Sequence, residues 1–298
     1  MTTDRRGTDV QHAAHDDLTR LAYGALAPRR VDTLMSRFMT PRRVVRAILS
    51  GRTSVSAAAR DAVAVDSVTR REELRDMGVS LVMADSPEFP ERLARYEGHP
   101  RWLFQRGSAS TQPTLGIVGT RACTAYGLEL AEMYGRVAAE SSWSVVSGLA
   151  RGIDGAAHRG AVAVGGHCHA ILGSGVDVIY PAGHRRLYAA ILDTGGLVTS
   201  ESPPGTRPEP WRFPARNRII AGCSDVLLVV EAGLKGGALI TARIALDYGV
   251  PVYAVPGDVD RATSIGTNRL IRDGAFPVFD AADLAEVLSL LNPLYAQP

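Results

Sequence analysis

The chain has 298 residues and a formal net charge of +2, and this length suits one large domain and one small one. Hydrophobic residues make up 46% of it and charged residues 21%, which excludes a mainly disordered, collagen-like or coiled-coil protein. No apolar run reaches the roughly 18 residues of a membrane-spanning helix, and the N-terminus has no hydrophobic signal core. We therefore expect a cytoplasmic protein that does not enter a membrane.

Residues 1–15 are expected to be disordered, and a small helical domain is predicted to follow them. Apolar and charged residues alternate there, with Pro28 and Pro41 at first helical turns and Gly51 after a last one. These signals predict a domain at 16–78 with helices at 16–27, 28–39, 41–51 and 67–78.

Arginine pairs lie on these predicted helices, namely Arg29 with Arg30, Arg42 with Arg43, and Arg70 with Arg71. Such pairs are typical both of a solvated helix face and of a surface that contacts nucleic acid. The abundance of arginine decides nothing, because a GC-rich genome would also explain why Lys235 is the single lysine among 33 basic residues.

From residue 79 onward, short apolar runs that end in glycine alternate with segments of helical length. The predicted strands lie at 79–85, 101–107, 115–119, 143–148, 169–175, 197–201, 225–232, 250–257 and 276–280. The predicted helices lie at 126–140, 152–164, 184–195, 236–249 and 281–291. Continuously apolar strands that alternate with helices predict an α/β domain at 79–290, with a doubly wound, mainly parallel, Rossmann-like sheet. We expect 291–298 to be a frayed tail.

Glycine stands at four turns that follow predicted strands of this sheet. The turns contain Gly119-Thr120-Arg121, Ser147-Gly148, Gly173, and Lys235-Gly236-Gly237. Ligands of such sheets bind at the carboxyl ends of the strands, and glycine permits positive φ and close approach of a phosphate. Several such turns on one edge predict a broad anionic ligand, although tight turns between strand and helix favour glycine in any case.

A nicotinamide cofactor is not expected at these turns. The first turn reads GTRACTAYG instead of G-x-G-x-x-G, and the second predicted strand ends in Ser147-Gly148, where a ribose-binding acid would stand. A metal is not expected either, because His167, Cys168 and His169 alternate between the two faces of a strand. Cys123, Cys168 and Cys223 are far apart and are interpreted as small core residues without disulfides.

The segment 211–222, WRFPARNRIIAG, combines aromatic rings and arginines after a proline-rich approach. Trp211 and Phe213 could stack on bases, and Arg212, Arg216 and Arg218 could bind phosphates. Proteins bind single-stranded nucleic acid through these two kinds of contact. Some of these aromatic rings could instead pack in the core, and some of the arginines could form internal ion pairs. We expect Asn217 to cap a helix.

The sequence contains no convincing set of catalytic residues. Asp154 and His158 share a predicted helix face, but no nucleophile accompanies them, so we expect them to anchor a turn. Glu231 ends a predicted strand and could act as a base in a hydrolase.

Six ordered strings resemble the DNA-processing protein A family, also called DprA or Smf. They are IVGTRACTAYG, VVSGLARGIDGAAHRGA, AILGSGVDVIYPAGHRRLY, SESPPGTRPEPWRFPARNRIIAGCSD, VVEAGLKGGALITARIAL and VYAVPGDVDRATSIGTNRLIRDGA, within about 80–290. The resemblance implies an extended Rossmann-like domain that binds single-stranded DNA without catalysis and forms homodimers. It also implies help in loading the RecA recombinase, chiefly during natural transformation, and no cofactor.

The resemblance also implies site residues for DNA. The family's phosphate-contacting turn falls on Gly119, Thr120 and Arg121, and its Phe-Pro-x-Arg-Asn-Arg element on Phe213, Pro214, Arg216, Asn217 and Arg218. Its Lys-Ser-Gly-Ser-Leu turn falls on Lys235, Gly236, Gly237, Ala238 and Leu239, where two hydroxyl groups are lost. With Ser147, Gly148 and Gly173, these turns complete the expected interface.

Other parts of the family pattern are matched less fully. The helical domain is similar to the SAM-like modules of many members, and the chain ends too early for the C-terminal winged helix that some members carry. Leu270 and Ile271 are candidates for the dimer contact that the resemblance implies.

Two other functions remain open from the sequence. One is a nucleotide-phosphate hydrolase of the lysine-decarboxylase-like Rossmann group that uses Glu231. The other is an adaptor for the recombinase, with DNA binding incidental.

Overall fold

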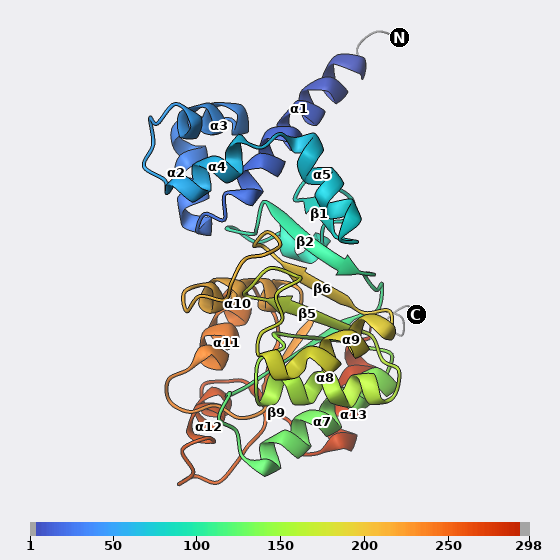
Figure 1. Ribbon diagram of the computed structural model, residues 1–298. Helices are drawn as coiled ribbons and strands as arrows, with labels where there is room; N and C mark the ends of the chain where they lie inside the picture. The colour runs from blue at the N-terminus through green and yellow to red at the C-terminus, as the bar shows by residue number, and fades with distance from the viewer. Residues whose placement is uncertain (1–3, 293–298) are drawn as a thin grey trace.

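The computed structural model describes residues 4–292, with side chains from residue 13 onward. Five helices form an N-terminal module above the sheet domain in Figure 1: α1 (Asp4–Tyr23), α2 (Pro28–Phe38), α3 (Pro41–Leu49), α4 (Ala57–Ala64) and α5 (Ser67–Asp76). The predicted frayed tail falls at 291–298, of which 293–298 lie outside the described residues.

Two helices of the module differ from the expectation. The expected disorder of 1–15 is wrong for 4–15, because α1 begins at Asp4. A helix that is established downstream extends at little cost into a polar segment without proline. The sequence analysis missed α4, which has neither proline nor glycine at its ends. Its signal was Ser56, whose side chain caps the helix by accepting a hydrogen bond from Ala59 N, 3.1 Å away.

Nine strands form one sheet, and each lies within one residue of a predicted strand. They are β1 (Ser80–Met83), β2 (Trp102–Gly107), β3 (Thr114–Val118), β4 (Ser144–Ser147), β5 (Cys168–Leu172), β6 (Leu197–Ser200), β7 (Val226–Val229), β8 (Val252–Ala254) and β9 (Phe276–Pro277). Their order is β1-β2-β6-β5-β4-β3-β7-β8-β9. β1 and β2 pair antiparallel and the other strands pair parallel among themselves, which confirms the mainly parallel, Rossmann-like sheet.

Helices cover both faces of the sheet, as expected for a doubly wound domain. One face packs against α7 (Ala125–Glu140), α8 (Ile153–Ala163), α9 (Arg185–Asp193) and α13 (Ala281–Leu291). The other packs against α6 (Glu91–Ala94), α10 (Arg212–Gly222), α11 (Gly237–Asp247) and α12 (Ile265–Arg272). β7 serves both layers, because Val226 and Leu228 join the first hydrophobic cluster and Leu227 and Val229 the second.

The strand order reverses direction at β3. The chain passes from β3 through β4 and β5 toward one edge of the sheet, and from β7 through β8 toward the other. The connections that leave the carboxyl ends of β3 and β7 therefore diverge and leave a crevice between them. The strand order alone therefore places a ligand site at this edge, whatever the side chains are.

The helical module is attached to the antiparallel side of the sheet. The rings of Tyr23 and Phe104 meet edge to face with their centroids 5.7 Å apart, and Arg101 forms an ion pair of 3.2 Å with Asp32. Apolar residues of the module and of the sheet belong to one continuous core cluster. None of the described helices combines the length and apolarity needed to cross a bilayer.

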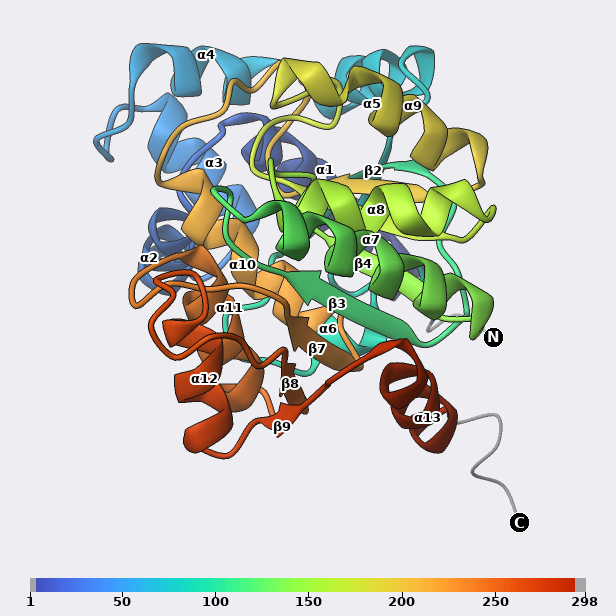
Figure 2. The same ribbon diagram turned by 90° about the horizontal axis from the view of Figure 1, so that it is seen from below.

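Helices α7 and α8 run side by side across one face (Figure 2) because glycines bring their backbones together. A Cβ atom at Gly135 would collide with the carbonyl oxygen of Ala157, and one at Gly160 with the carbonyl oxygen of Glu132. Backbone atoms cannot move aside as a flexible side chain can, so both positions require glycine.

We predict that Gly160→Ala lowers the free energy of unfolding by about 1–3 kcal/mol, because the added methyl group forces the two helices apart. Urea unfolding measures the change. Gly183→Ala is the matched control, because a Cβ atom at Gly183 meets nothing within 4 Å. Equal stability of the two variants would contradict this account of the helix contact.

Candidate functional site

A groove of about 660 Å³ lies at the carboxyl ends of β3 and β7, in the crevice that the strand order creates. The turn after β3 forms one wall, the turn after β7 forms another, and α10 closes the third side. Nine predicted site residues line the groove: Gly119, Thr120, Arg121, Phe213, Arg216, Asn217, Lys235, Gly236 and Gly237.

Helix α10 is fixed against the next helix by Asn217. The amide nitrogen of this buried residue donates a hydrogen bond of 3.2 Å to the carbonyl oxygen of Gly237, where α11 begins. The expectation that Asn217 caps a helix is wrong, because α10 already begins at Arg212. Asn217 instead holds the turn at Lys235 beside the groove wall.

Two cations on the groove are exposed. The Arg121 guanidinium lies over the Phe213 ring, 4.6 Å from its centroid, and Lys235 stands on the exposed turn before α11. Among the described residues, neither cation forms an ion pair with a carboxylate. Both charges are therefore available to an anion without breaking an internal salt bridge.

Arg216 is a cation of another kind, because its side chain is buried beneath the groove. Only 5% of the residue is exposed, and its Nη1 donates a hydrogen bond of 2.7 Å to the carbonyl oxygen of Ile171, in β5. Its guanidinium occupies the space that a Cβ atom at Gly148 would need. Burial lowers the pKa of Arg216 to about 10, so it still carries its charge at neutral pH.

Asp154 is the one acid among the described residues that line the groove. Its carboxylate accepts a hydrogen bond of 3.2 Å from Gly148 N. Burial raises the pKa of Asp154, while the charges of Arg216 and Arg121 pull it back down. The lining therefore has three cations against one anion, which favours an anionic ligand.

The glycines of the groove are explained by space and not by positive φ, which none of the predicted site glycines adopts. Gly119 makes room for the side chain of Ile153, and Gly173 lies against the Phe213 ring. At Gly236, in contrast, an added Cβ atom would meet nothing within 4 Å. Close approach of a ligand to open backbone is therefore possible at the turn before α11.

A smaller hollow of about 170 Å³ adjoins the groove, and the stacked pair of Arg121 and Phe213 borders both. Gly148 and Gly173 line this hollow, so these two predicted residues lie next to the groove. Tyr180 borders both spaces, with its ring centroid 5.6 Å from that of Phe213. The sequence analysis missed Tyr180, although an exposed aromatic residue closely following a glycine-rich turn was a usable signal.

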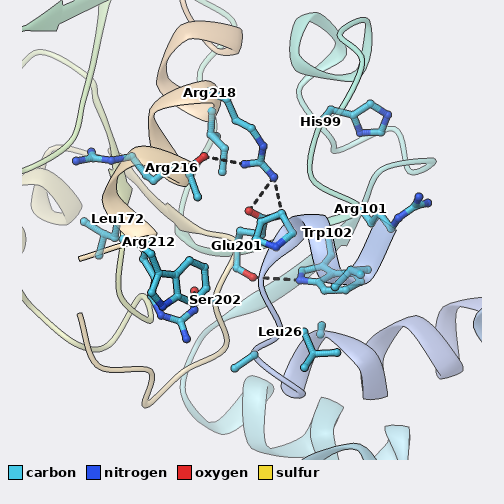
Figure 3. A pocket seen from close by; sticks show the side chains of 18 of the residues that line it. Leu26, His99, Arg101, Trp102, Leu172, Glu201, Ser202, Arg212, Arg216 and Arg218 are labelled. Atoms are coloured by element: carbon cyan, nitrogen blue, oxygen red, sulfur yellow. Dashed lines mark hydrogen bonds and ion pairs between the residues drawn. The ribbon is translucent and has the colours of Figure 1, made fainter. Parts of the chain in front are cut away.

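Two predicted site residues lie elsewhere. Ser147 is fully buried, and its Oγ donates a hydrogen bond of 2.6 Å to the carbonyl oxygen of Ile117. Arg218 points toward a cavity of about 30 Å³ between the helical module and the sheet (Figure 3). There its Nη2 donates to both carboxylate oxygens of Glu201, at 2.7 and 2.9 Å, and its Nε donates to the carbonyl oxygen of Gly98.

Two of the residues considered for catalysis are an engaged carboxylate and a buried imidazole. The Glu231 carboxylate accepts hydrogen bonds from the backbone nitrogen and the hydroxyl group of Thr124, at 2.9 and 2.7 Å, so it fixes the start of α7. His158 is fully buried, and burial lowers its pKa to about 3, which keeps it neutral. Within residues 4–292, no three potential metal ligands gather into a cluster.

We predict that Arg218→Met lowers the free energy of unfolding by about 1–3 kcal/mol, because Glu201 and Gly98 lose their donor. Urea unfolding measures the change. Arg207→Met is the control, because Arg207 is exposed in the same proline-rich region. If the two variants are equally stable, the ion pair of Arg218 does not hold this part of the fold.

Comparisons with known proteins find relatives over most of this chain. A family model described as DNA recombination-mediator protein A matches residues 80–289. Protein Smf of Escherichia coli is 40% identical over 210 residues, which cover 70% of this chain and 56% of that protein. DNA processing protein DprA of Bacillus subtilis is 36% identical over 227 residues, which cover 75% of this chain and 76% of the relative. The chain thus spans little more than half the length of the Escherichia coli relative.

Two solved structures are also similar. DNA processing protein A from Streptococcus pneumoniae matches with a TM-score of 0.74 and 30% identity over 90% of this chain and 96% of that one. The same protein from Helicobacter pylori, in a structure that concerns its single-stranded DNA binding mode, matches with a TM-score of 0.63 and 26% identity. That match covers 72% of this chain and 97% of the Helicobacter pylori chain.

Proposed function

The chain belongs to the DNA recombination-mediator protein A family, and on this premise we propose that it binds single-stranded DNA in the groove without catalysing a reaction on it. The observation that carries this proposal is that two exposed cations, Arg121 and Lys235, line the same groove as a half-buried aromatic ring, Phe213. The single-stranded DNA binding described for the Helicobacter pylori relative supports it.

The sugar-phosphate backbone is the part of the ligand that the groove fits best. The first amides of α11 have no acceptor within their own helix, and they follow directly on Lys235 and the open backbone of Gly236. Arg121 offers a forked guanidinium from the opposite wall. A phosphate between these walls meets positive groups from both sides.

Phe213 supplies the contact for a base. Its ring is half-buried, with Arg121 over one face and Tyr180 beside it. A base can stack on an aromatic ring whatever its sequence, because every base has a π face. Binding should therefore depend little on sequence and strongly on salt, since affinity comes mainly from counterion release.

We predict that Arg121→Gln weakens the binding of oligo-dT and makes the salt dependence of affinity less steep by about 0.7 per lost phosphate contact. Phe213→Leu should cost about 1–3 kcal/mol of binding free energy, through lost stacking, and leave the salt slope unchanged. Filter binding at several salt concentrations measures both quantities.

Arg136→Gln is the control for these variants, because Arg136 is an exposed arginine on α7, away from the groove lining. It should bind as the parent does. Unchanged affinity of Arg121→Gln at low and at moderate salt would remove Arg121 from the site. Equal affinity of the parent protein for single- and double-stranded DNA would argue against single-stranded DNA as the ligand.

We further propose that the chain forms homodimers and helps to load RecA on the bound strand. The family description as a recombination mediator supports the second part. For the dimer, Leu270 and Ile271 are partly buried against the chain's own core, so each has only part of its surface left for a partner. Exposed rings nearby, Phe276 at 58% and Phe279 at 66%, add apolar surface that association would cover.

Both partner proposals have direct measurements. Sedimentation equilibrium should give about twice the 31.8 kDa of one chain at micromolar concentration. Pull-down of RecA should survive treatment with nuclease if the proteins touch. A monomer at all concentrations rejects the dimer, and capture that nuclease abolishes rejects the direct contact with RecA.

A further inference from the structure

The charge of this protein is concentrated in the helical module. Residues 28–60 contain eight arginines and one aspartate, a formal charge of +7, whereas the whole chain has +2. The other 265 residues together therefore carry −5. The groove does not account for this concentration, because it lies in the sheet domain.

Arg37 and Arg46 stand in the last turns of α2 and α3, where the helix dipole favours cations, but the arginines of the first turns are not placed to stabilise their helices. Both α2 and α3 open with Pro-Arg-Arg and have no acidic residue in the first turn. The positive end of a helix dipole disfavours cations there by a few tenths of a kcal/mol or more. Local stability therefore does not explain the two Pro-Arg-Arg openings.

Four arginines around the turn between α2 and α3 form what we call the arginine patch: Arg37, Arg42, Arg43 and Arg46. All are exposed, and Met39 in the turn between them is 71% exposed. The one acid of the segment, Asp32, is paired with Arg101 of the sheet domain. Burial raises the pKa of Asp17 in α1, and Arg42 and Arg46 lie close enough for their charges to lower it again in part, so Asp17 balances part of the charge of the patch.

The module lies beside the wall of the groove. Pro28 and Val31 of α2 line the small cavity of Figure 3 together with Arg212 and Arg216 of α10. The residues of α10 between them, Phe213 and Pro214, line the groove. Figures 1 and 2 agree that α2 and α3 lie on the same side of the molecule as α10 and α11.

Trp211 stands between the two regions. It is 41% exposed and lines the interdomain cavity, while its neighbour Pro210 lines the groove. The Arg212 guanidinium lies 4.3 Å from the centroid of its ring. Because Arg212 is itself paired with Glu209, at 2.9 Å, the Trp211 ring is the group at this boundary that a passing strand could contact.

We propose that the arginine patch is a second contact for the same single-stranded nucleic acid, and that it holds the sugar-phosphate backbone of the stretch that leaves the groove past Trp211. This inference rests on the proposed function and extends it to a longer site. A polyanion is the occupant that complements an exposed cluster of arginines, and a strand already held in the groove reaches the patch at high local concentration.

The test compares two triple variants that remove equal charge. Arg37→Gln, Arg42→Gln and Arg43→Gln together weaken the patch. Arg75→Gln, Arg136→Gln and Arg159→Gln together are the control, on exposed positions of α5, α7 and α8. Affinity is measured for oligo-dT of about 6 nucleotides, which a groove alone can hold, and of about 30, which can reach both surfaces.

The patch variant should bind the long oligomer at least tenfold more weakly than the parent at low salt, with a salt slope less steep by about 2 for its three lost contacts. It should bind the short oligomer as the parent does. The control variant should match the parent for both lengths, and urea unfolding should show that both triple variants remain folded.

Three results would overturn the inference. The first is an unchanged affinity of the patch variant for the long oligomer, with the parent binding both lengths; this leaves the groove proposal standing. The second is an equal loss in patch and control variants, which indicates general charge alone. The third is an effect on binding to phosphatidylglycerol vesicles but not to DNA, which makes the patch a membrane contact. If the parent binds neither oligomer, the proposed function itself fails, and the patch proposal with it.

Discussion

The buried guanidinium of Arg216 is the interaction on which the candidate site depends. It ties α10 to the end of β5 through the carbonyl oxygen of Ile171, and it occupies the space left free at Gly148, after β4. A charge this deeply buried is tolerated only when it is paired and hydrogen-bonded, and the carboxylate of Asp154 supplies the opposite charge. Once α10 is placed, Asn217 fixes the turn before α11 through its hydrogen bond to Gly237, and Phe213, about one helical turn before Asn217, lies under Arg121.

Cations in this protein therefore divide into those that hold the fold and those that remain free. Arg216 and Arg218 are engaged with a backbone carbonyl group and a carboxylate, respectively, and removing either one leaves a buried acceptor unsatisfied. Arg121 and Lys235 have no such partner and project into the groove. The same division separates the arginine patch of the module from Arg101, which holds the module to the sheet through Asp32. Counts of arginine would not reveal this, whereas burial and pairing do.

The sequence predicted the sheet well because its parallel strands are buried on both faces and read as continuous apolar runs. It also predicted most of the groove, since any turn that follows a parallel strand must reach the same edge of the sheet. The failures lie where the answer depends on distant residues. Arg216 and Arg218 are equivalent in a motif, but positions two residues apart are rotated by about 200° around a helix, so the two side chains point in different directions. Glu201, the ion-pair partner of Arg218, belongs to the loop after another strand. The first turns of α1 likewise have no signal of their own, and the start of α4 is signalled by Ser56 alone.

Amide hydrogen exchange with and without oligo-dT tests the central claim most directly, because it reports on the backbone of the groove itself. The account predicts slower exchange at residues 119–122 and 236–239 when the strand binds, with α13 on the opposite face of the sheet unchanged as the internal reference. Binding that leaves both turns unprotected, or that protects α13 instead, would contradict it.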